Sequence, residues 1–333
     1  MKIYLRLLFP FYLIILILLS GCETSPPVEQ NYSETTSEII INSYPSGAEI
    51  FIDGLTTGFF TPDTLEIKNG NHVIKIVRDG YLDSITELNI EENKKYIVNV
   101  ILQTAEQTKI VLIEDFANVS CSPCVFSNLI VKSLSQYTYG HSKVVAISYH
   151  ANFPSVNDPF YLANSSEISN ALNFYNIYYV PSTFIDGRVT SNSLDSISMK
   201  AVINTNLQKV SSFNIDVSKT INNDSLFIHV EVHKLNQSIV QFNNLSLKIA
   251  VVESEIEFLT PPGNNLETKF YDVMRLMIPN FTGSTLSELT DIADLNFNFT
   301  VYIKPEWQKD KLQVISFIQN TQTKEVLQTN STF

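Results

Sequence analysis

The stretch that decides the fold is Ile110-Val111-Leu112-Ile113, followed shortly by Cys121-Ser122-Pro123-Cys124. The apolar run predicts a buried strand, and residues 125–136 after the cysteines are compatible with a helix. This arrangement places the first sulfur at the positive end of a helix, where a thiolate is stabilised and becomes a nucleophile. The second sulfur, one turn into the helix, can then attack the mixed disulfide that the first one forms.

A CxxC pair can also be half of a zinc site, which needs a second pair of ligands. The chain has no second CxxC pair, and its only other cysteine is Cys22. We therefore expect no metal and no other cofactor. The pair is interpreted as redox-active or as a structural disulfide.

The N-terminus has the features of a secretory signal. Basic residues Lys2 and Arg6 precede an apolar run over 7–19, which is short for a membrane-spanning helix. The sequence Leu19-Ser20-Gly21-Cys22 resembles the bacterial lipobox, which implies a signal peptide over 1–21 and lipidation of Cys22. An ordinary signal peptide or an uncleaved anchor is the alternative. Glu23 after the cysteine favours the outer over the inner membrane.

Residues 22–37 are rich in Pro, Ser, Thr and Glu and lack periodicity, which predicts a tether between the lipid and the folded part. The whole chain has 34 acidic and 22 basic residues, for a formal charge of −12. That balance argues against nucleic acid and anionic headgroups as partners. The expected membrane contact is therefore the lipid on Cys22.

Residues 38–104 predict a small all-β sandwich. Short alternating runs such as 48–52 and 72–77 are separated by turn signals such as Asp53-Gly54 and Lys68-Asn69-Gly70. The string Tyr44-Pro45-Ser46-Gly47-Ala48-Glu49-Ile50-Phe51-Ile52 resembles the PEGA domain, with Ser46 in place of the family's Glu. The resemblance implies a spacing or interaction role and no catalytic residue.

Two further domains are expected. Residues 108–207 alternate strands and helices, with strands over 109–116 and 143–149 and helices over 165–174 and 197–210. Residues 211–333 return to period-2 alternation, which predicts a C-terminal β-sandwich. The expected fold is therefore multidomain, with α/β architecture between two β domains.

The order strand, CxxC, helix, strand, helix, Val180-Pro181, strand resembles the thioredoxin superfamily. The resemblance implies a cis-proline loop at Pro181 that faces the disulfide and shapes a substrate groove with Val180. Ser122 and Pro123 would line the same groove. Without the resemblance, Pro181 is an ordinary trans proline before a strand. Two departures stand out: Ser120 replaces a tryptophan, and the Ser-Pro dipeptide replaces Gly-Pro.

Asp115 lies six residues before Cys121, the offset at which thioredoxins carry a buried acid. Such a carboxylate can take the proton from the resolving thiol. Glu114 precedes it, and strand alternation points the two side chains to opposite faces, so we expect one of them to face inward. The alternative is a solvated acid at a strand end. We assign Cys121 as the nucleophile and Cys124 as the resolving thiol.

Several short motifs together are similar to the 28-kilodalton outer-membrane lipoprotein family. They include Tyr149-His150, Asp158-Pro159 and Ile185-Asp186-Gly187, and the resemblance extends over roughly 108–330. It implies a thioredoxin-like domain joined to a C-terminal β domain. His150 could complete a copper site with two thiolates, or simply be hydrogen-bonded in its loop.

The sequence thus predicts a lipid-anchored envelope thiol–disulfide oxidoreductase that acts on an unidentified protein thiol or disulfide. The alternative is a non-enzymatic surface or assembly lipoprotein whose cysteines form a permanent bridge. Such a bridge closes a very short loop and contributes little chain entropy.

Overall fold

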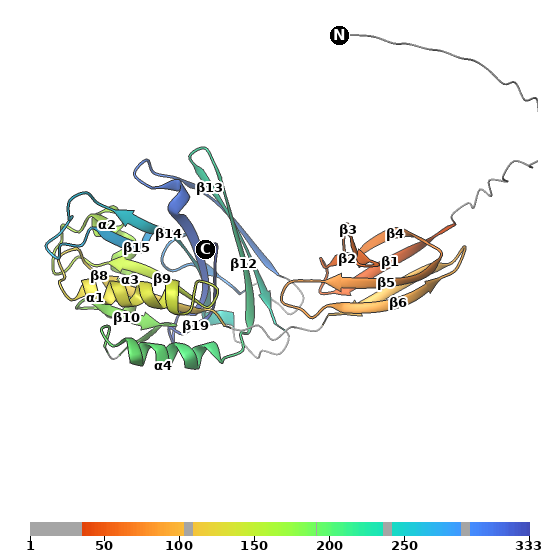
Figure 1. Ribbon diagram of the computed structural model, residues 1–333, viewed down its shortest axis with the longest axis horizontal. Helices are drawn as coiled ribbons and strands as arrows, with labels where there is room; N and C mark the ends of the chain where they lie inside the picture. The colour runs from red at the N-terminus through yellow and green to blue at the C-terminus, as the bar shows by residue number, and fades with distance from the viewer. Residues whose placement is uncertain (1–34, 103–108, 191, 236–241, 288–293) are drawn as a thin grey trace, which may run out of the picture.

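The computed structural model describes residues 35–102, 109–190, 192–235, 242–287 and 294–333 (Figure 1). The predicted signal peptide and Cys22 lie outside these residues, as does most of the tether. No described residues form a helix long and apolar enough to cross a membrane.

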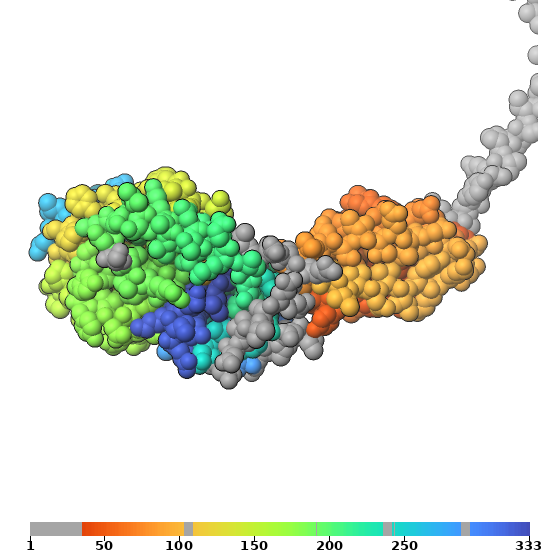
Figure 2. Space-filling view, turned by 90° about the horizontal axis from the view of Figure 1, so that it is seen from below, coloured from red at the N-terminus to blue at the C-terminus, as the bar shows by residue number. Residues whose placement is uncertain are grey.

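The N-terminal domain is built from seven strands in two sheets. The first sheet has the order β4-β1-β7 and the second β3-β2-β5-β6. The strands are β1 Thr36–Tyr44, β2 Glu49–Ile52, β3 Leu55–Phe60, β4 Asp63–Lys68, β5 Gly70–Val77, β6 Ser84–Ile90 and β7 Lys95–Ile101. Alternate side chains such as Ile39, Ile41, Ile74 and Ile76 form its buried core, as the period-2 pattern requires. This domain forms its own lobe at one end of the molecule (Figure 2).

A mixed sheet runs through the larger lobe in the order β11-β10-β8-β9-β15-β14-β18-β19, with β16 also paired to β14. Its strands are β8 Val111–Ala117, β9 Val144–His150, β10 Ser182–Ile185, β11 Arg188–Val189, β14 Leu245–Glu257, β15 Lys269–Ile278, β16 Ser284–Thr285, β18 Leu312–Asn320 and β19 Val326–Ser331. β15 joins β9 in parallel, with Val273 opposite Ser148. One sheet therefore crosses the expected boundary near residue 210.

Helices cover both faces of this sheet beside β8 and β9. The helices are α1 Cys124–Lys132, continued by a π-helical segment Ser133–Thr138, α2 Pro159–Ala163, α3 Ser165–Tyr175 and α4 Ser196–Leu207. One face packs Leu112 and Phe116 of β8 against Ile168 and Leu172 of α3. The other face packs β8 against the α1 and α4 side, including Val131 and Ile203. Because both faces of β8 are covered, its seven residues are all buried.

A fourth sheet, β12-β13-β17, comprises Phe213–Asn222, Ser225–Lys234 and Leu295–Tyr302. Its residues Ile215 and Val230 share a core with Leu247 and Val314 of β14 and β18. Short 3₁₀ turns lie at Phe242–Asn244 and Lys309–Lys311. The expectation of a multidomain, mostly β chain with α/β structure in the middle is confirmed. The predicted helices over 165–174 and 197–210 correspond to α3 and α4.

Candidate functional site

Cys121 and Cys124 form a disulfide between the end of β8 and the start of α1, with their Cα atoms 5.3 Å apart. The cysteines are 4 % and 0 % exposed, and they pack against Ala117 and the half-buried Val180. The Val180–Pro181 peptide bond is cis. The structure thus brings together both predicted sulfurs and the predicted groove residue Val180.

The two residues between the cysteines, Ser122 and Pro123, are exposed. Large apolar side chains are exposed in both segments that supply the predicted groove. They are Phe126 and Leu129 on α1, and Tyr178 and Tyr179 just before the cis proline, all more than half exposed. Exposed apolar side chains of this size are typical of protein-docking surfaces when they lie together.

The connection between β14 and β15 packs against the CxxC loop. The backbone N–H of Asn265 donates to the Val119 carbonyl at 3.1 Å, and its side-chain amide reaches the Cys121 carbonyl at 3.5 Å. A Cβ atom on Gly263 would lie 2.1 Å from the Val119 carbonyl oxygen, so only glycine permits this approach. Sequence analysis missed this contact. The turn-forming run Pro261-Pro262-Gly263 marks a tight loop there, but nothing in it identifies the partner.

Asp115 is buried in the layer between β8 and α1. Its Oδ1 accepts hydrogen bonds from Thr183 Oγ1 at 2.6 Å and from Ser127 Oγ at 3.2 Å. Burial raises the pKa of this carboxyl to about 6, and the two hydroxyl hydrogen bonds oppose the rise. No described cation forms an ion pair with it within 4 Å. An acid with a pKa near 6 can exchange its proton near neutral pH.

Glu114 points to the opposite face of β8, toward α3. Its carboxylate accepts hydrogen bonds from the hydroxyls of Tyr149 and Tyr175, and burial raises its pKa to about 6. Burial also lowers the pKa of the neighbouring Lys248 to about 8. The two side chains point to opposite faces of β8, as predicted. Both are buried, and not one alone, because helices cover both faces of the sheet.

His150, at the end of β9, is buried and its Nδ1 lies 2.8 Å from Asp158 Oδ2. Burial alone would raise the pKa of Asp158, but the charge and hydrogen bond of His150 hold it below its ordinary value. Asp158 also caps the N-terminus of α2. The structure therefore supports the hydrogen-bonded alternative for His150.

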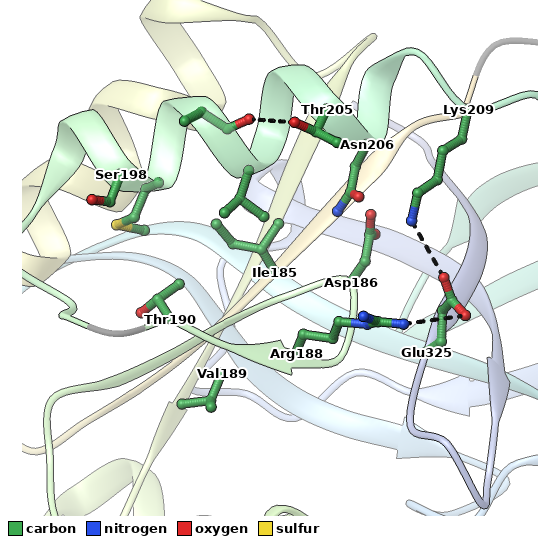
Figure 3. Close-up of a pocket in the computed structure, with 13 residues that line it drawn as sticks. Ile185, Asp186, Arg188, Val189, Thr190, Ser198, Thr205, Asn206, Lys209 and Glu325 are labelled. Atoms are coloured by element: carbon green, nitrogen blue, oxygen red, sulfur yellow. Dashed lines mark hydrogen bonds and ion pairs between the residues drawn. The ribbon is translucent and has the colours of Figure 1, made fainter.

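A pocket of about 520 Å³ opens between α4 and the β10–β11 hairpin (Figure 3). Glu325 lies between Arg188 at 3.9 Å and Lys209 at 3.4 Å at its rim. Asp186 in its wall forms a buried ion pair with Lys109 at 3.1 Å. Because β10 runs antiparallel to β8, this pocket lies at the opposite end of β8 from the cysteines.

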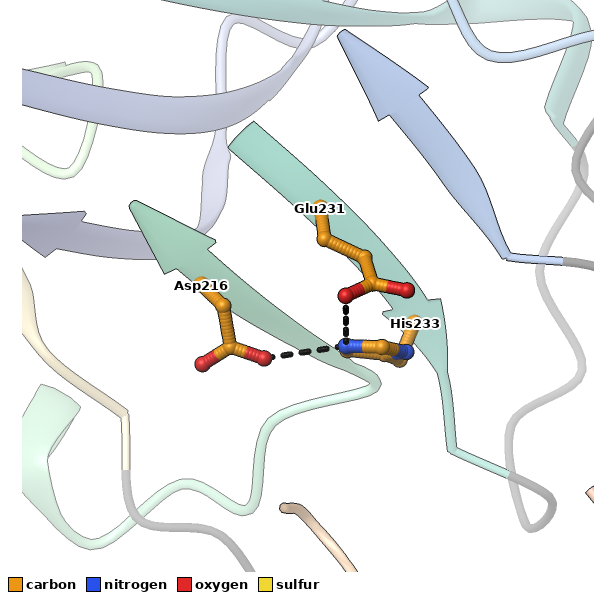
Figure 4. Close-up of side chains that lie close together, drawn as sticks. All are labelled: Asp216, Glu231 and His233. Atoms are coloured by element: carbon orange, nitrogen blue, oxygen red, sulfur yellow. Dashed lines mark hydrogen bonds and ion pairs between the residues drawn. The ribbon is translucent and has the colours of Figure 1, made fainter. Parts of the chain in front are cut away.

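A second polar cluster lies where the N-terminal domain meets β12 and β13. Asp216, Glu231 and His233 bring three metal-ligand atoms within 4.8 Å of one another (Figure 4). Both nitrogens of His233 already face carboxylates, Asp216 and Asp294, at 2.9 Å each. Arg78 of the N-terminal domain also bonds Asp294. We interpret the cluster as an ion-pair network that joins the two lobes.

The sequence also contains an HxxxH pair, His229 and His233, which was not predicted as a site; only His233 belongs to this cluster. On the extended strand β13, residues four apart are separated by about 13 Å. His229 Nδ1 instead lies 2.9 Å from Asn298 on β17. The two histidines therefore do not share a ligand position.

Two known protein families match parts of this chain. Residues 36–106 match the PEGA domain family, and residues 169–332 match the family described as outer membrane protein Omp28. No match was found among curated proteins. The Omp28 family is described as an outer membrane protein, which agrees with the predicted outer-membrane location.

Two solved structures are similar. HBP35 of Porphyromonas gingivalis is 12 % identical with a TM-score of 0.56, over 67 % of this chain and 74 % of that one. A domain of the outer membrane lipoprotein Omp28 from Porphyromonas gingivalis is 12 % identical with a TM-score of 0.27, over 37 % of this chain and 88 % of that one. At this identity the first likeness concerns the fold alone.

Proposed function

We propose that this chain, an outer-membrane lipoprotein that joins a PEGA domain to an Omp28 domain, is a thiol–disulfide oxidoreductase of the cell envelope. The proposal treats residues 108–207 as a thioredoxin-like unit. It is supported by the order β8, CxxC, α1, β9, α3, cis Pro181 and β10, with the cysteines at the start of α1. Residues 22–37 would serve as the tether from the lipid on Cys22.

The main support for the proposal is that Asp115 is buried, with no cation beside it among the described residues, and has a raised pKa. Burying a carboxyl without a cation is costly, and a disulfide that only cross-links the loop would gain nothing from it. A redox-active pair benefits from a buried acid nearby, because the resolving cysteine must lose or accept a proton at each turnover. Perturbed acids of this kind concentrate at functional sites.

The exchange can be written from the oxidised state that the structure holds. A thiolate of a substrate dithiol attacks Cys121 Sγ, forming a mixed disulfide and releasing Cys124 as a thiolate. Asp115 transfers its proton to that thiolate. The second substrate thiolate then attacks the substrate's own sulfur, forming the substrate disulfide and releasing the Cys121 thiolate. Two electrons pass from the substrate dithiol to the protein, and the reverse sequence reduces a substrate disulfide.

The surface around the cysteines suits an unfolded or extended protein substrate. Val180, which precedes cis Pro181, is half-buried against the cysteines, and Ser122 and Pro123 between them are exposed. The exposed Phe126 and Tyr179 would contact the apolar side chains of that substrate.

A second candidate function is a non-enzymatic surface or assembly lipoprotein with a structural disulfide. The burial of both cysteines, with the Asn265 segment packed on the CxxC loop, favours it. Under this alternative, exchange with a protein dithiol would require the loop to unfold.

The midpoint potential of the Cys121–Cys124 couple separates the two functions. A potential above about −250 mV, measured in graded thiol buffers, belongs to an exchanging catalyst, and one below about −300 mV to an inert bridge. A Cys124→Ser variant tests the same point in the envelope, because it cannot resolve a mixed disulfide. Accumulation of disulfide-linked partners on Cys121 is expected. Their absence, with Cys121→Ser as the matched control, would support the structural bridge.

A further inference from the structure

A small, partly enclosed cavity lies beside Asp115 and is lined in part by α1. Its volume is about 20 Å³, which is enough for one water molecule. Besides Asp115 from β8, it is lined by Asn128 and Lys132 from α1, Ser148 from β9 and Asp272 from β15. The strand that joins the C-terminal part to the α/β part therefore contributes a second acid to the surroundings of Asp115.

Two acceptor atoms at this cavity have no hydrogen-bond donor among the described residues: Asn128 Oδ1 and Asp272 Oδ1. The amide group of Asn128 is fixed in orientation, because its nitrogen donates to both carboxylate oxygens of Glu267 at 2.9 and 3.0 Å. A buried acceptor without a donor costs about 1–3 kcal/mol. Because burial keeps Asp272 protonated at neutral pH, a water molecule can accept from Asp272 and donate to Asn128 Oδ1 with one hydrogen left for Asp115, so the cavity has the size and the polarity of a water site.

Asp272 is held in place by the backbone. It is 2 % exposed and adopts φ 51°, a left-handed conformation that only Gly, Asn and Asp take readily. This conformation lies within β15, one residue before Val273, which pairs with Ser148. The backbone thereby places the Asp272 carboxyl at the cavity that Asp115, Asn128 and Ser148 also line.

We propose that Asp272 and a water in this cavity form a proton relay that recharges Asp115. The proposal rests on the proposed function. After Asp115 has given its proton to the Cys124 thiolate, the water donates a proton to Asp115 and receives one from Asp272. Asp272 then regains its proton from solvent, so the net transfer is one proton from solvent to the Cys124 sulfur.

At neutral pH Asp272 is the protonated member of the pair; transfer of its proton to Asp115, the weaker base, is uphill and is driven by the Cys124 thiolate that takes the proton from Asp115. Burial raises the pKa of Asp272 to about 8, so this carboxyl keeps its proton at pH 7, whereas the pKa of Asp115 is about 6. The charged groups that act on the pair are Lys132 on Asp272, and His150 and Glu267 on Asp115. The final acceptor is a thiolate, a stronger base than either carboxylate, so the overall transfer is favourable.

The test is the rate at which a dithiol reduces the Cys121–Cys124 disulfide in Asp272→Asn, measured with dithiothreitol from pH 5 to pH 9 on the full chain. Asparagine tolerates φ 51° and keeps an acceptor oxygen, so the backbone should be preserved. We expect about a tenfold lower rate between pH 6 and 7.5 and convergence with the wild type above pH 8.5, where Asp272 of the wild type is ionised and has no proton to donate. Ser148→Ala, which alters the same cavity without removing a titratable group, is the matched control.

The outcomes are distinct. A pH profile of Asp272→Asn that matches the wild type, or is lowered by one factor at every pH, would overturn the relay and leave the proposed function in place. A wild-type disulfide that dithiothreitol does not open at any pH would overturn both. In Asp115→Asn the relay has no recipient, so adding Asp272→Asn to that variant should change the rate by less than twofold; a full tenfold further loss would contradict the relay.

Discussion

Replacing Asp115 by asparagine should stabilise the protein, and only at a pH where the aspartate is charged. In the folded chain burial raises the pKa of Asp115 from 3.8 to about 6. At 1.36 kcal/mol for each pKa unit, this difference corresponds to about 3 kcal/mol. The sign follows from proton binding: the folded state holds the proton more tightly, so its stability falls as pH rises from about 4 to about 6. Asparagine keeps an acceptor oxygen for Thr183 and Ser127 and carries no charge, so it should remove this loss.

The assay is urea unfolding of the full chain in detergent at pH 4 and pH 7.5. The chain's single tryptophan, Trp307, is buried in the core that β14 and β18 share with β12, so its fluorescence reports on the sheet that contains β8. We expect the two proteins to unfold at similar urea at pH 4. At pH 7.5 the variant midpoint should be about 1 M higher, for an m value near 3 kcal/mol per molar. Exposed Asp310→Asn is the control, and equal midpoints at pH 7.5 for wild type and Asp115→Asn would refute the reasoning.

Three further changes probe the surroundings of the site. Gly263→Ala places a Cβ atom 2.1 Å from the Val119 carbonyl oxygen, so it should displace this loop from the cysteines and lower the free energy of unfolding by about 1–3 kcal/mol. Dithiothreitol should then reduce the disulfide faster. An unchanged reduction rate would show that the loop does not limit access. Lys109→Met leaves Asp186 buried without its cation and should lower stability by about 3–5 kcal/mol in urea unfolding, and a loss below 1 kcal/mol would contradict a buried pair. The exposed Arg188–Glu325 pair is 3.9 Å long, so Glu325→Gln should change the melting temperature by no more than about 2 °C, measured by calorimetry.

The position of the CxxC pair follows from local sequence, because a strand, a CxxC and a helix succeed one another within thirty residues. The burial of both Glu114 and Asp115 does not follow, since it depends on helices packing on both faces of β8. The place of β15 in the sheet is harder still to predict from the sequence. Asp272 and Arg275 interrupt its apolar pattern, although both are buried, and its partner β9 lies more than a hundred residues earlier in the chain. Long-range pairing of this kind leaves no local periodicity for sequence analysis to detect.

The parallel pairing of β15 with β9 also sets an order of assembly during export. The cysteines leave the cytoplasm about 150 residues before Asp272 does, so they reach the oxidising envelope while β9 still has an unpaired edge. An unpaired edge strand associates readily with other chains. The segment with the CxxC motif should therefore neither fold fully alone nor work when transplanted without the C-terminal strands. The CxxC segment and the last third of the chain therefore form a single structural unit, because their strands share one sheet.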